Sequence, residues 1–141
     1  MKRVMFLCTA NSCRSQMAEG FARKFGKGII DVHSAGLMAA GVHRRAASVM
    51  SEIGIDISHQ RSKEIDETLL LQMDIIVTLC GHAESTCPVT PPEIRRIHWP
   101  IQDPVGTTGP EEVVMQNFRR ARDEIKTLVQ GLIKDLSEEK K

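Results

Sequence analysis

The residues of this chain best suited to chemistry are Cys8 and Arg14, which stand six positions apart and are followed by Ser15. Backbone N–H groups between the two can surround a tetrahedral oxyanion, and the positive end of a following helix would point to the same place. The planar guanidinium of Arg14 can hold two oxygens of that anion at once, which a lysine cannot do. The same groups favour a thiolate at Cys8, to which Ser15 can donate a hydrogen bond. The pattern predicts a nucleophilic cysteine beside a bound oxyanion, with no metal required.

Such a loop needs a strand before it and a helix after it, and the flanking sequence predicts both. Residues 4–7 are all apolar, as in a buried parallel strand, and apolar residues at helical spacing begin after Ser15. Breaker residues make segment 81–92 look irregular. By the same periodicities, further strands are expected at 29–33, 74–79 and 94–98, and further helices at 46–53, 62–72 and 110–136.

Alternating strands and helices predict an α/β fold, with one three-layer domain around a parallel sheet of about four strands. The domain is expected to span residues 1–136, and the charged tail 137–141 is expected to fray. Binding sites in such sheets lie beyond the carboxyl ends of the strands. Cys8 and Cys80 stand at those ends, and Asp103 follows the last expected strand. The three side chains should therefore meet at one edge of the sheet.

Composition narrows the functional classes. The chain has 141 residues, of which 41% are apolar, and a formal net charge of +1. The near-neutral charge argues against nucleic acid binding, and the short apolar runs argue against a membrane span. The apolar start is interrupted by Asn11, so it reads as a first strand and not as a signal peptide. Four cysteines in a chain of this kind suggest reactive thiols in the reducing cytoplasm.

Residues 6–21, FLCTANSCRSQMAEGF, closely resemble the anion loop and first helix of thioredoxin-coupled arsenate reductases. These enzymes share the fold of low-molecular-weight protein tyrosine phosphatases, so the resemblance implies a phosphatase-like fold with flavodoxin-like strand order. The likeness covers nearly the whole chain up to the last helix. The motifs that follow in the family's order are Ser34-Ala35-Gly36, Gly41-Val42-His43, Gly54-Ile55-Asp56-Ile57-Ser58, Val77-Thr78-Leu79-Cys80, Cys87-Pro88 and Asp103-Pro104.

The resemblance implies reduction of arsenate to arsenite. Cys8 would attack arsenic, and Asp103 would act as general acid for the departing hydroxide. Cys80 would then attack Cys8 and release arsenite, and Cys87 would attack Cys80, leaving a disulfide for thioredoxin to reduce. The implied catalytic residues are Cys8, Arg14, Ser15, Cys80, Cys87 and Asp103, and the implied arsenate-binding loop is Thr9, Ala10, Asn11, Ser12, Cys13, Arg14 and Ser15.

The resemblance implies neither a metal nor a cofactor for the reaction, and the protein is expected to be a cytoplasmic monomer. Some family members hold a potassium ion beneath the anion loop on Asn, Glu, Ser and Asp side chains. Asn11, Glu19 and Ser34 match the first three, whereas Lys63 stands at the position of the aspartate. We hypothesise that the ammonium of Lys63 takes the place of the ion.

Three alternatives stay open on sequence grounds. A phosphatase acting on phosphotyrosine or small phosphate esters needs the same loop, but it does not need the pair Cys80 and Cys87. A zinc site on Cys80, His82, Cys87 and His98 has a spacing that fits none of the usual patterns. A noncatalytic anion-binding or redox-sensing module would leave Asp103 and the set of three thiols unexplained.

Overall fold

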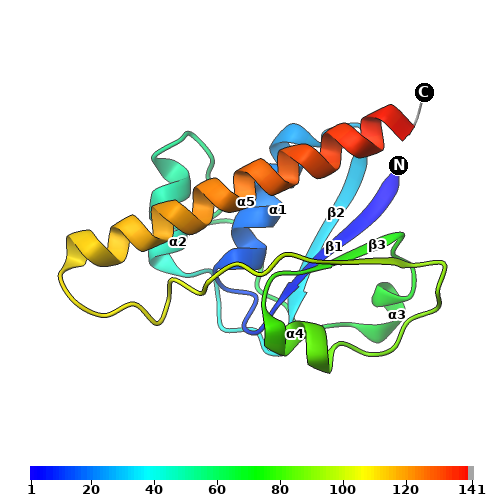
Figure 1. Ribbon diagram of the computed structural model, residues 1–141, viewed down its shortest axis with the longest axis horizontal. Coiled ribbons are helices and arrows are strands. Elements are labelled where there is room, and N and C mark those ends of the chain that lie inside the picture. The colour runs from blue at the N-terminus through cyan, green and yellow to red at the C-terminus, as the bar shows by residue number, and fades with distance from the viewer. Residues whose placement is uncertain (140–141) are drawn as a thin grey trace.

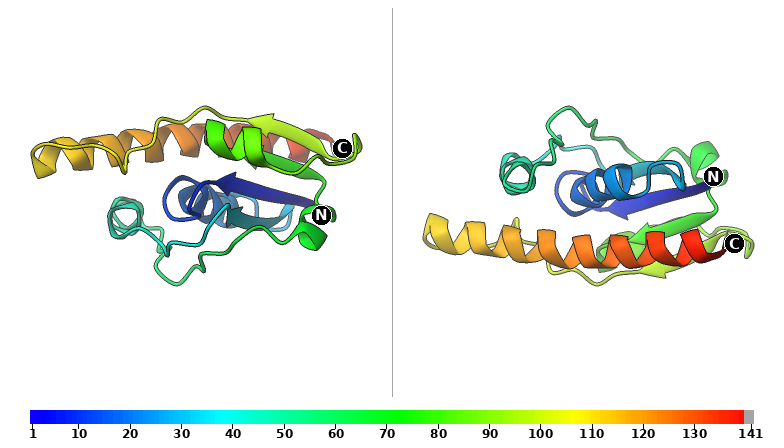
Figure 2. Two further views of the ribbon diagram at one scale, coloured as in Figure 1. Left: turned by 90° about the horizontal axis from the view of Figure 1, so that it is seen from below. Right: turned by 90° about the horizontal axis from the view of Figure 1, so that it is seen from above.

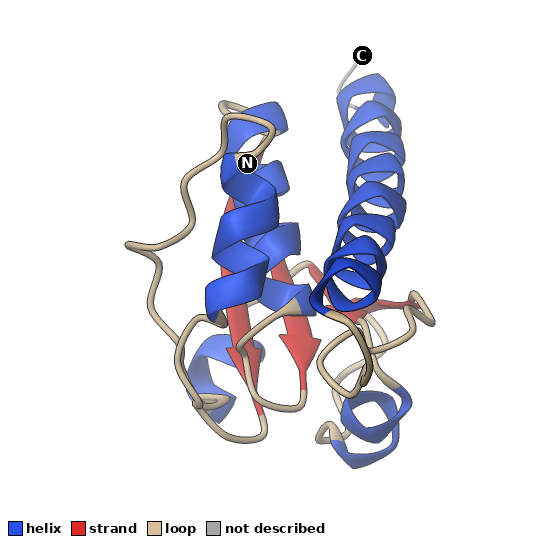
Figure 3. Ribbon diagram, turned by 90° about the vertical axis from the view of Figure 1, so that its left-hand side faces the viewer, coloured by secondary structure: helices blue, strands red, loops and turns tan. Residues whose placement is uncertain are grey.

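A four-stranded parallel sheet forms the centre of the computed structural model, which describes residues 1–139 apart from the side chain of His82. The strand order is β2-β1-β3-β4, so the expected sheet and its flavodoxin-like order are confirmed. Figure 3 shows the strand arrowheads pointing toward loops at the end opposite to the chain N-terminus. The strands are β1 (Lys2–Cys8), β2 (Ile30–Gly36), β3 (Ile75–Thr78) and β4 (Arg95–His98).

Helices cover both faces of the sheet and make three layers. The long helix α5 (Glu111–Glu139) lies beside α1 (Arg14–Phe25) and α2 (Arg44–Ser51) on one face (Figure 1). The other face carries the short helices α3 (Glu67–Leu70) and α4 (Gly81–Thr86). Figure 2 shows the start of β1 and the end of α5 at the same end of the molecule.

The alternation of side chains along β1 divides the core into two clusters. Val4 and Phe6 point into a large cluster with α1, α2 and α5. Met5 and Leu7 point into a smaller cluster with α3 and α4. All four side chains are almost completely buried, as expected for a central parallel strand that is covered on both faces.

The expected helix at 62–72 is wrong, because tertiary contacts hold its first residues in an irregular conformation. Ser62 Oγ donates to the Asn11 carbonyl (2.8 Å), and the Lys63 amide donates to Asn11 Oδ1 (2.7 Å). Glu64 forms an isolated bridge with Gly36. Helix α3 begins only after Asp66, whose carboxylate caps the Thr68 amide (2.9 Å).

Three other differences concern segment limits and exposure. Residues 81–86, expected to be irregular, form the helix α4. Helix α5 continues to Glu139, so residues 137–139 of the expected tail are helical, and residues 140–141 lie outside the described part. Val113 has an apolar side chain near the start of this helix, yet it is 49% exposed. Within residues 1–139, no helix is long and apolar enough to cross a membrane.

Candidate active site

The loop between β1 and α1 is held in shape by the buried side chain of Asn11. Its φ of 44° lies in the left-handed region, which asparagine tolerates better than most residues. Its amide nitrogen donates to Ser15 Oγ (2.8 Å) and Ser34 Oγ (3.1 Å). Its oxygen accepts from Gln16 Nε2 (3.0 Å) and the Lys63 amide (2.7 Å). All four hydrogen-bonding positions of the amide are used, so the loop is formed before any ligand arrives.

Gly36 allows the end of β2 to pass directly against this loop. A Cβ atom at Gly36 would lie 2.5 Å from the Asn11 backbone nitrogen and 2.8 Å from the Met38 carbonyl oxygen. Backbone bonds continue the contact, because the Met38 amide donates to the Thr9 carbonyl (3.0 Å). Any larger residue at Gly36 would displace the anion loop.

Cys8 lies at the base of the loop with a hydroxyl beside its sulfur. Cys8 Sγ and Ser15 Oγ are 2.8 Å apart. Ser15 Oγ accepts a hydrogen bond from Asn11, so its single hydrogen is available to the sulfur. The geometry therefore places a hydrogen-bond donor on the thiol that the sequence singles out as the nucleophile.

Arg14 has a structural role that the sequence did not reveal. Its side chain is almost buried, and one terminal nitrogen donates to the carbonyls of Leu79 (3.2 Å) and Ile101 (2.8 Å). The other terminal nitrogen lies 3.5 Å from Asp103 Oδ2. The guanidinium thus joins the loops after β3 and β4 to the anion loop.

A pocket opens above the loop, and it brings most of the predicted residues together. Asp103, whose side chain is 50% exposed, lies at this pocket with Arg14. Asn11 and Ser15, which are also predicted to bind substrate, are completely buried and do not line the pocket, and their side chains hydrogen-bond to each other. The lining residues are Cys8, Thr9, Ala10, Ser12, Cys13, Arg14, Ala40, His43, Asp103 and Val105.

His43 is a pocket residue to which sequence reasoning assigned no role. Its Nδ1 accepts from the Arg45 amide (3.1 Å), which caps α2, and its ring lies 5.1 Å from the ring of Phe118. Burial and the neighbouring arginines Arg45 and Arg44 lower the pKa of His43. The motif Gly41-Val42-His43 was the only signal that could have pointed to it.

The second and third thiols stand at the two ends of α4. Cys80 Sγ lies 3.2 Å from Thr9 Oγ1, beside the anion loop, and accepts from the Ala83 amide (3.3 Å). Cys87 ends the helix and is 8% exposed. Burial raises the pKa of the Cys87 thiol, and Arg96 opposes that effect. The four cysteines, all described, are free.

Cys13 is predicted to make the protein less stable in alkali. Burial raises the pKa of its thiol far above the ordinary value, with Asp103 and Cys8 adding to the effect. A raised pKa favours the protonated folded state, so this stability is present below about pH 8.5, the ordinary thiol pKa, and is lost as the pH rises further. The loss approaches about 1.4 kcal/mol per pH unit.

Urea unfolding of wild type and Cys13→Ala, between about pH 8 and about pH 10, measures this contribution. The variant should be the less stable protein at the lower pH, and the gap should narrow as the pH rises. Cys87 is present in both proteins, so its own raised pKa cancels in the difference. A gap that stays constant with pH would contradict the prediction.

Beneath the loop, Lys63 occupies the position suggested by its place in the sequence. Its ammonium is 3.8 Å from Glu19 Oε1, and Ser34 Oγ donates to the same carboxylate oxygen. Burial lowers the pKa of Lys63, and Glu19 counteracts this. Arg23 Nε also donates to the Glu19 carboxylate (2.9 Å). Because these two cations already neutralise Glu19, the residues present do not fit a potassium ion.

Potassium is therefore predicted to have no specific effect on activity. Initial rates of arsenite formation should be equal in potassium and sodium salts at equal ionic strength, which controls for general screening. Activation by potassium alone would contradict the substitution of Lys63 for the ion.

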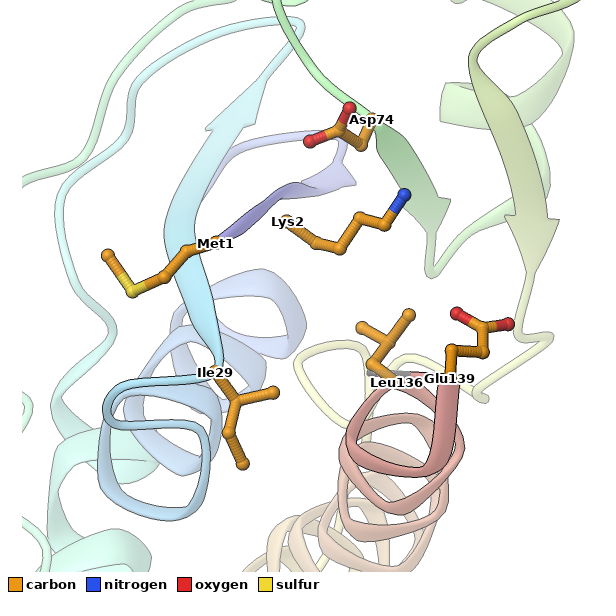
Figure 4. Close-up of a pocket in the computed structure, with 6 residues that line it drawn as sticks. All are labelled: Met1, Lys2, Ile29, Asp74, Leu136 and Glu139. Carbon is orange, nitrogen blue, oxygen red and sulfur yellow. The ribbon is translucent and has the colours of Figure 1, made fainter. Parts of the chain in front are cut away.

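Neither a second pocket nor the rival zinc set offers a comparable candidate for a catalytic site. A second pocket, at the other end, is drawn in Figure 4 and contains no cysteine. Among the described residues, no group of three or more His, Cys, Asp or Glu could hold a metal ion, and the His82 side chain of the rival zinc set lies outside them. The pocket in Figure 4 is lined by Met1, Lys2, Ile29, Asp74, Leu136 and Glu139.

Comparison with known proteins now adds to this geometry. Residues 3–141 match the low molecular weight phosphotyrosine protein phosphatase family. The chain belongs to this family. Within it, the chain is 52% identical to an arsenate reductase of Halalkalibacterium halodurans over 124 residues, which is 88% of this chain and 89% of the relative. It is 49% identical to an arsenate reductase of Bacillus subtilis, again over 88% and 89% of the two chains.

A solved member of the family has the same architecture. The structure described as an arsenate reductase in the phosphate binding state matches with a TM-score of 0.78 and 41% identity, over 96% of this chain and 99% of that one. That related protein therefore binds phosphate, which is a tetrahedral oxyanion.

Proposed function

We propose that this family member reduces arsenate to arsenite through Cys8, Cys80 and Cys87. The observation that carries the proposal is the contact between Cys80 Sγ and Thr9 Oγ1, which places a second thiol beside the loop that holds Cys8. A hydrolytic phosphatase has no use for that thiol. Arsenate as the substrate is also supported by the arsenate reductases to which this chain is 52% and 49% identical.

In the first step, the Cys8 sulfur attacks arsenic. Asp103 donates a proton to the departing hydroxide, which leaves as water. Arg14 and the loop amides hold the remaining oxygens. Cys80 then attacks Cys8, and the electron pair of the arsenic–sulfur bond passes to arsenic. Arsenite leaves, and a Cys8–Cys80 disulfide remains. The two thiols thus supply the two electrons that reduce arsenic.

The third thiol completes the relay. Cys87 attacks Cys80, so Cys8 is released as a thiol and a Cys80–Cys87 disulfide forms. Cys80 and Cys87 flank the two ends of α4. They stand seven positions apart, which corresponds to about 10 Å along the helix axis. A disulfide needs Cα atoms within about 7 Å, so α4 must unwind in this step. The dithiol of thioredoxin then reduces the exposed disulfide.

An anaerobic single-turnover experiment tests the proposed function. Reduced protein is mixed with arsenate, and lost thiols and arsenite are counted. Two thiols should disappear for each arsenite formed, and thioredoxin with its reductase and NADPH should restore them. Release of phosphate from p-nitrophenyl phosphate, without thiol loss on arsenate, would favour the hydrolytic alternative.

The expected monomer and its cytoplasmic location form part of the proposal. Gel filtration with light scattering checks the first, and fractionation of cells that express the protein checks the second.

A further inference from the structure

Helix α4 is attached to the sheet by a buried hydroxyl that does not belong to the candidate site. Thr78, on β3, is 1% exposed. Its Oγ1 lies 2.7 Å from Glu84 Oε2 on α4 and 2.8 Å from His98 Nδ1 on β4. A threonine hydroxyl has one hydrogen, and an ionised carboxylate only accepts. Thr78 therefore donates to Glu84, and the Nδ1–H of His98 donates to Thr78.

Apolar packing holds α4 only weakly. Of the side chains described between its two flanking cysteines, Ala83 alone is buried. One alanine removes little apolar surface from water, so a hydrogen bond to a carboxylate is a large share of what fixes this helix. Further attachments stand at the two ends of the helix, at Cys80 and at Pro88, whose carbonyl accepts from Arg96 (3.0 Å).

We propose that Glu84, held by Thr78 and His98, is a positioning residue that keeps α4 helical and docked and so sets how often Cys87 is free to attack Cys80. The inference rests on the proposed relay, in which α4 must unwind. It concerns the frequency of opening and leaves the attack of Cys8 on arsenic unchanged.

The surroundings of Cys87 give the opening a second effect. Burial raises the pKa of this thiol while α4 is docked. Unwinding removes that burial, so the thiol becomes more acidic as it comes within reach of Cys80. The Cys87 thiol is therefore protected while the Glu84–Thr78 contact is intact and reactive once that contact is broken.

Thiol labelling without arsenate tests this inference separately from the proposed function. Reduced protein is treated with iodoacetamide at fixed pH, and the labelled cysteines are identified by mass spectrometry. Glu84→Ala should accelerate labelling of Cys87 about ten-fold, because it removes the acceptor of a charged hydrogen bond. Labelling of Cys8 in the same sample should not change and serves as the internal reference.

Matched variants distinguish the contact from a general loss of charge or fold. Thr78→Val removes the hydroxyl with little change of shape and should act like Glu84→Ala. The double variant should add nothing to either. Glu84→Gln keeps an acceptor oxygen and should stay close to wild type. Glu93→Ala removes an exposed acid outside α4 and should have no effect.

The lifetime of the Cys8–Cys80 disulfide is a further measurement, and it would not change if Glu84 only stabilised the fold. In Glu84→Ala, the Cys8–Cys80 intermediate should be shorter-lived, while the KM for arsenate stays the same. Unchanged Cys87 labelling in the Glu84→Ala and Thr78→Val variants would overturn the inference, and so would equal acceleration at Cys8. Faster Cys87 labelling without any arsenite formation would uphold it and reject the proposed function instead.

Discussion

Replacing Arg14 with lysine should lower kcat/KM for arsenate by about 30- to 1000-fold. The guanidinium can hold two oxygens of the oxyanion, whereas an ammonium is a single point charge. Loss of such a clamp costs about 2 to 4 kcal/mol in the transition state. Steady-state arsenite formation, coupled to thioredoxin and its reductase, measures the effect.

Stability must be measured for the same Arg14 variant. Arg14 also donates to the carbonyls of Leu79 and Ile101, so the lysine variant should lose about 1 to 3 kcal/mol of unfolding free energy. Arg120→Lys, on the outer part of α5, is the matched control and should leave both quantities unchanged. Near-normal turnover of Arg14→Lys would remove the loop from the proposed mechanism.

Replacing Cys87 with serine should stop the enzyme after about one turnover. Cys8 and Cys80 remain able to release one arsenite per molecule, but their disulfide cannot be passed outward. The product burst should equal the enzyme concentration, and mass spectrometry of peptides should show the Cys8–Cys80 bridge. Cys8→Ser should form no arsenite, because no thiolate is left to attack arsenic.

Two results would contradict this order of events. Multiple turnovers of Cys87→Ser at the wild-type rate, with thioredoxin as sole reductant, would leave Cys87 without a role. Efficient arsenite release by Cys80→Ser would show that another group breaks the arsenic–sulfur bond. Cys13→Ser is the control variant, because Cys13 lines the pocket but takes no step in the relay. This variant should still perform multiple turnovers.

The sequence was sufficient to predict that the residues of the anion loop lie together, because they are neighbours along the chain. Cys8 ends an apolar strand and Arg14 and Ser15 begin a helix, so periodicity alone places the three residues around one loop. The meeting of Cys80 with that loop followed from the rule that parallel strands end at one edge. The resemblance to a known family then supplied the roles that spacing cannot give.

The supports of the loop were not predictable in the same way. Asn11 and Lys63 meet across fifty-two positions, and that contact holds the first residues of the helix expected at 62–72 in an irregular conformation. Local propensity contains no information about such distant partners, and tertiary contacts override it. The helix α4 was missed for a different reason, since its cap is the Cys80 sulfur and cysteine is not among the residues that usually signal a helix start.

The division of the core into two clusters has a consequence for how this protein can change over evolutionary time. Cys8, Cys80 and Cys87 all belong to the smaller cluster, whereas Cys13 and the helices α1, α2 and α5 belong to the larger one. Substitutions that tighten the larger cluster can therefore raise resistance to heat without hindering the unwinding of α4. Robustness and turnover are separate traits in such an architecture, and selection can improve one without sacrificing the other.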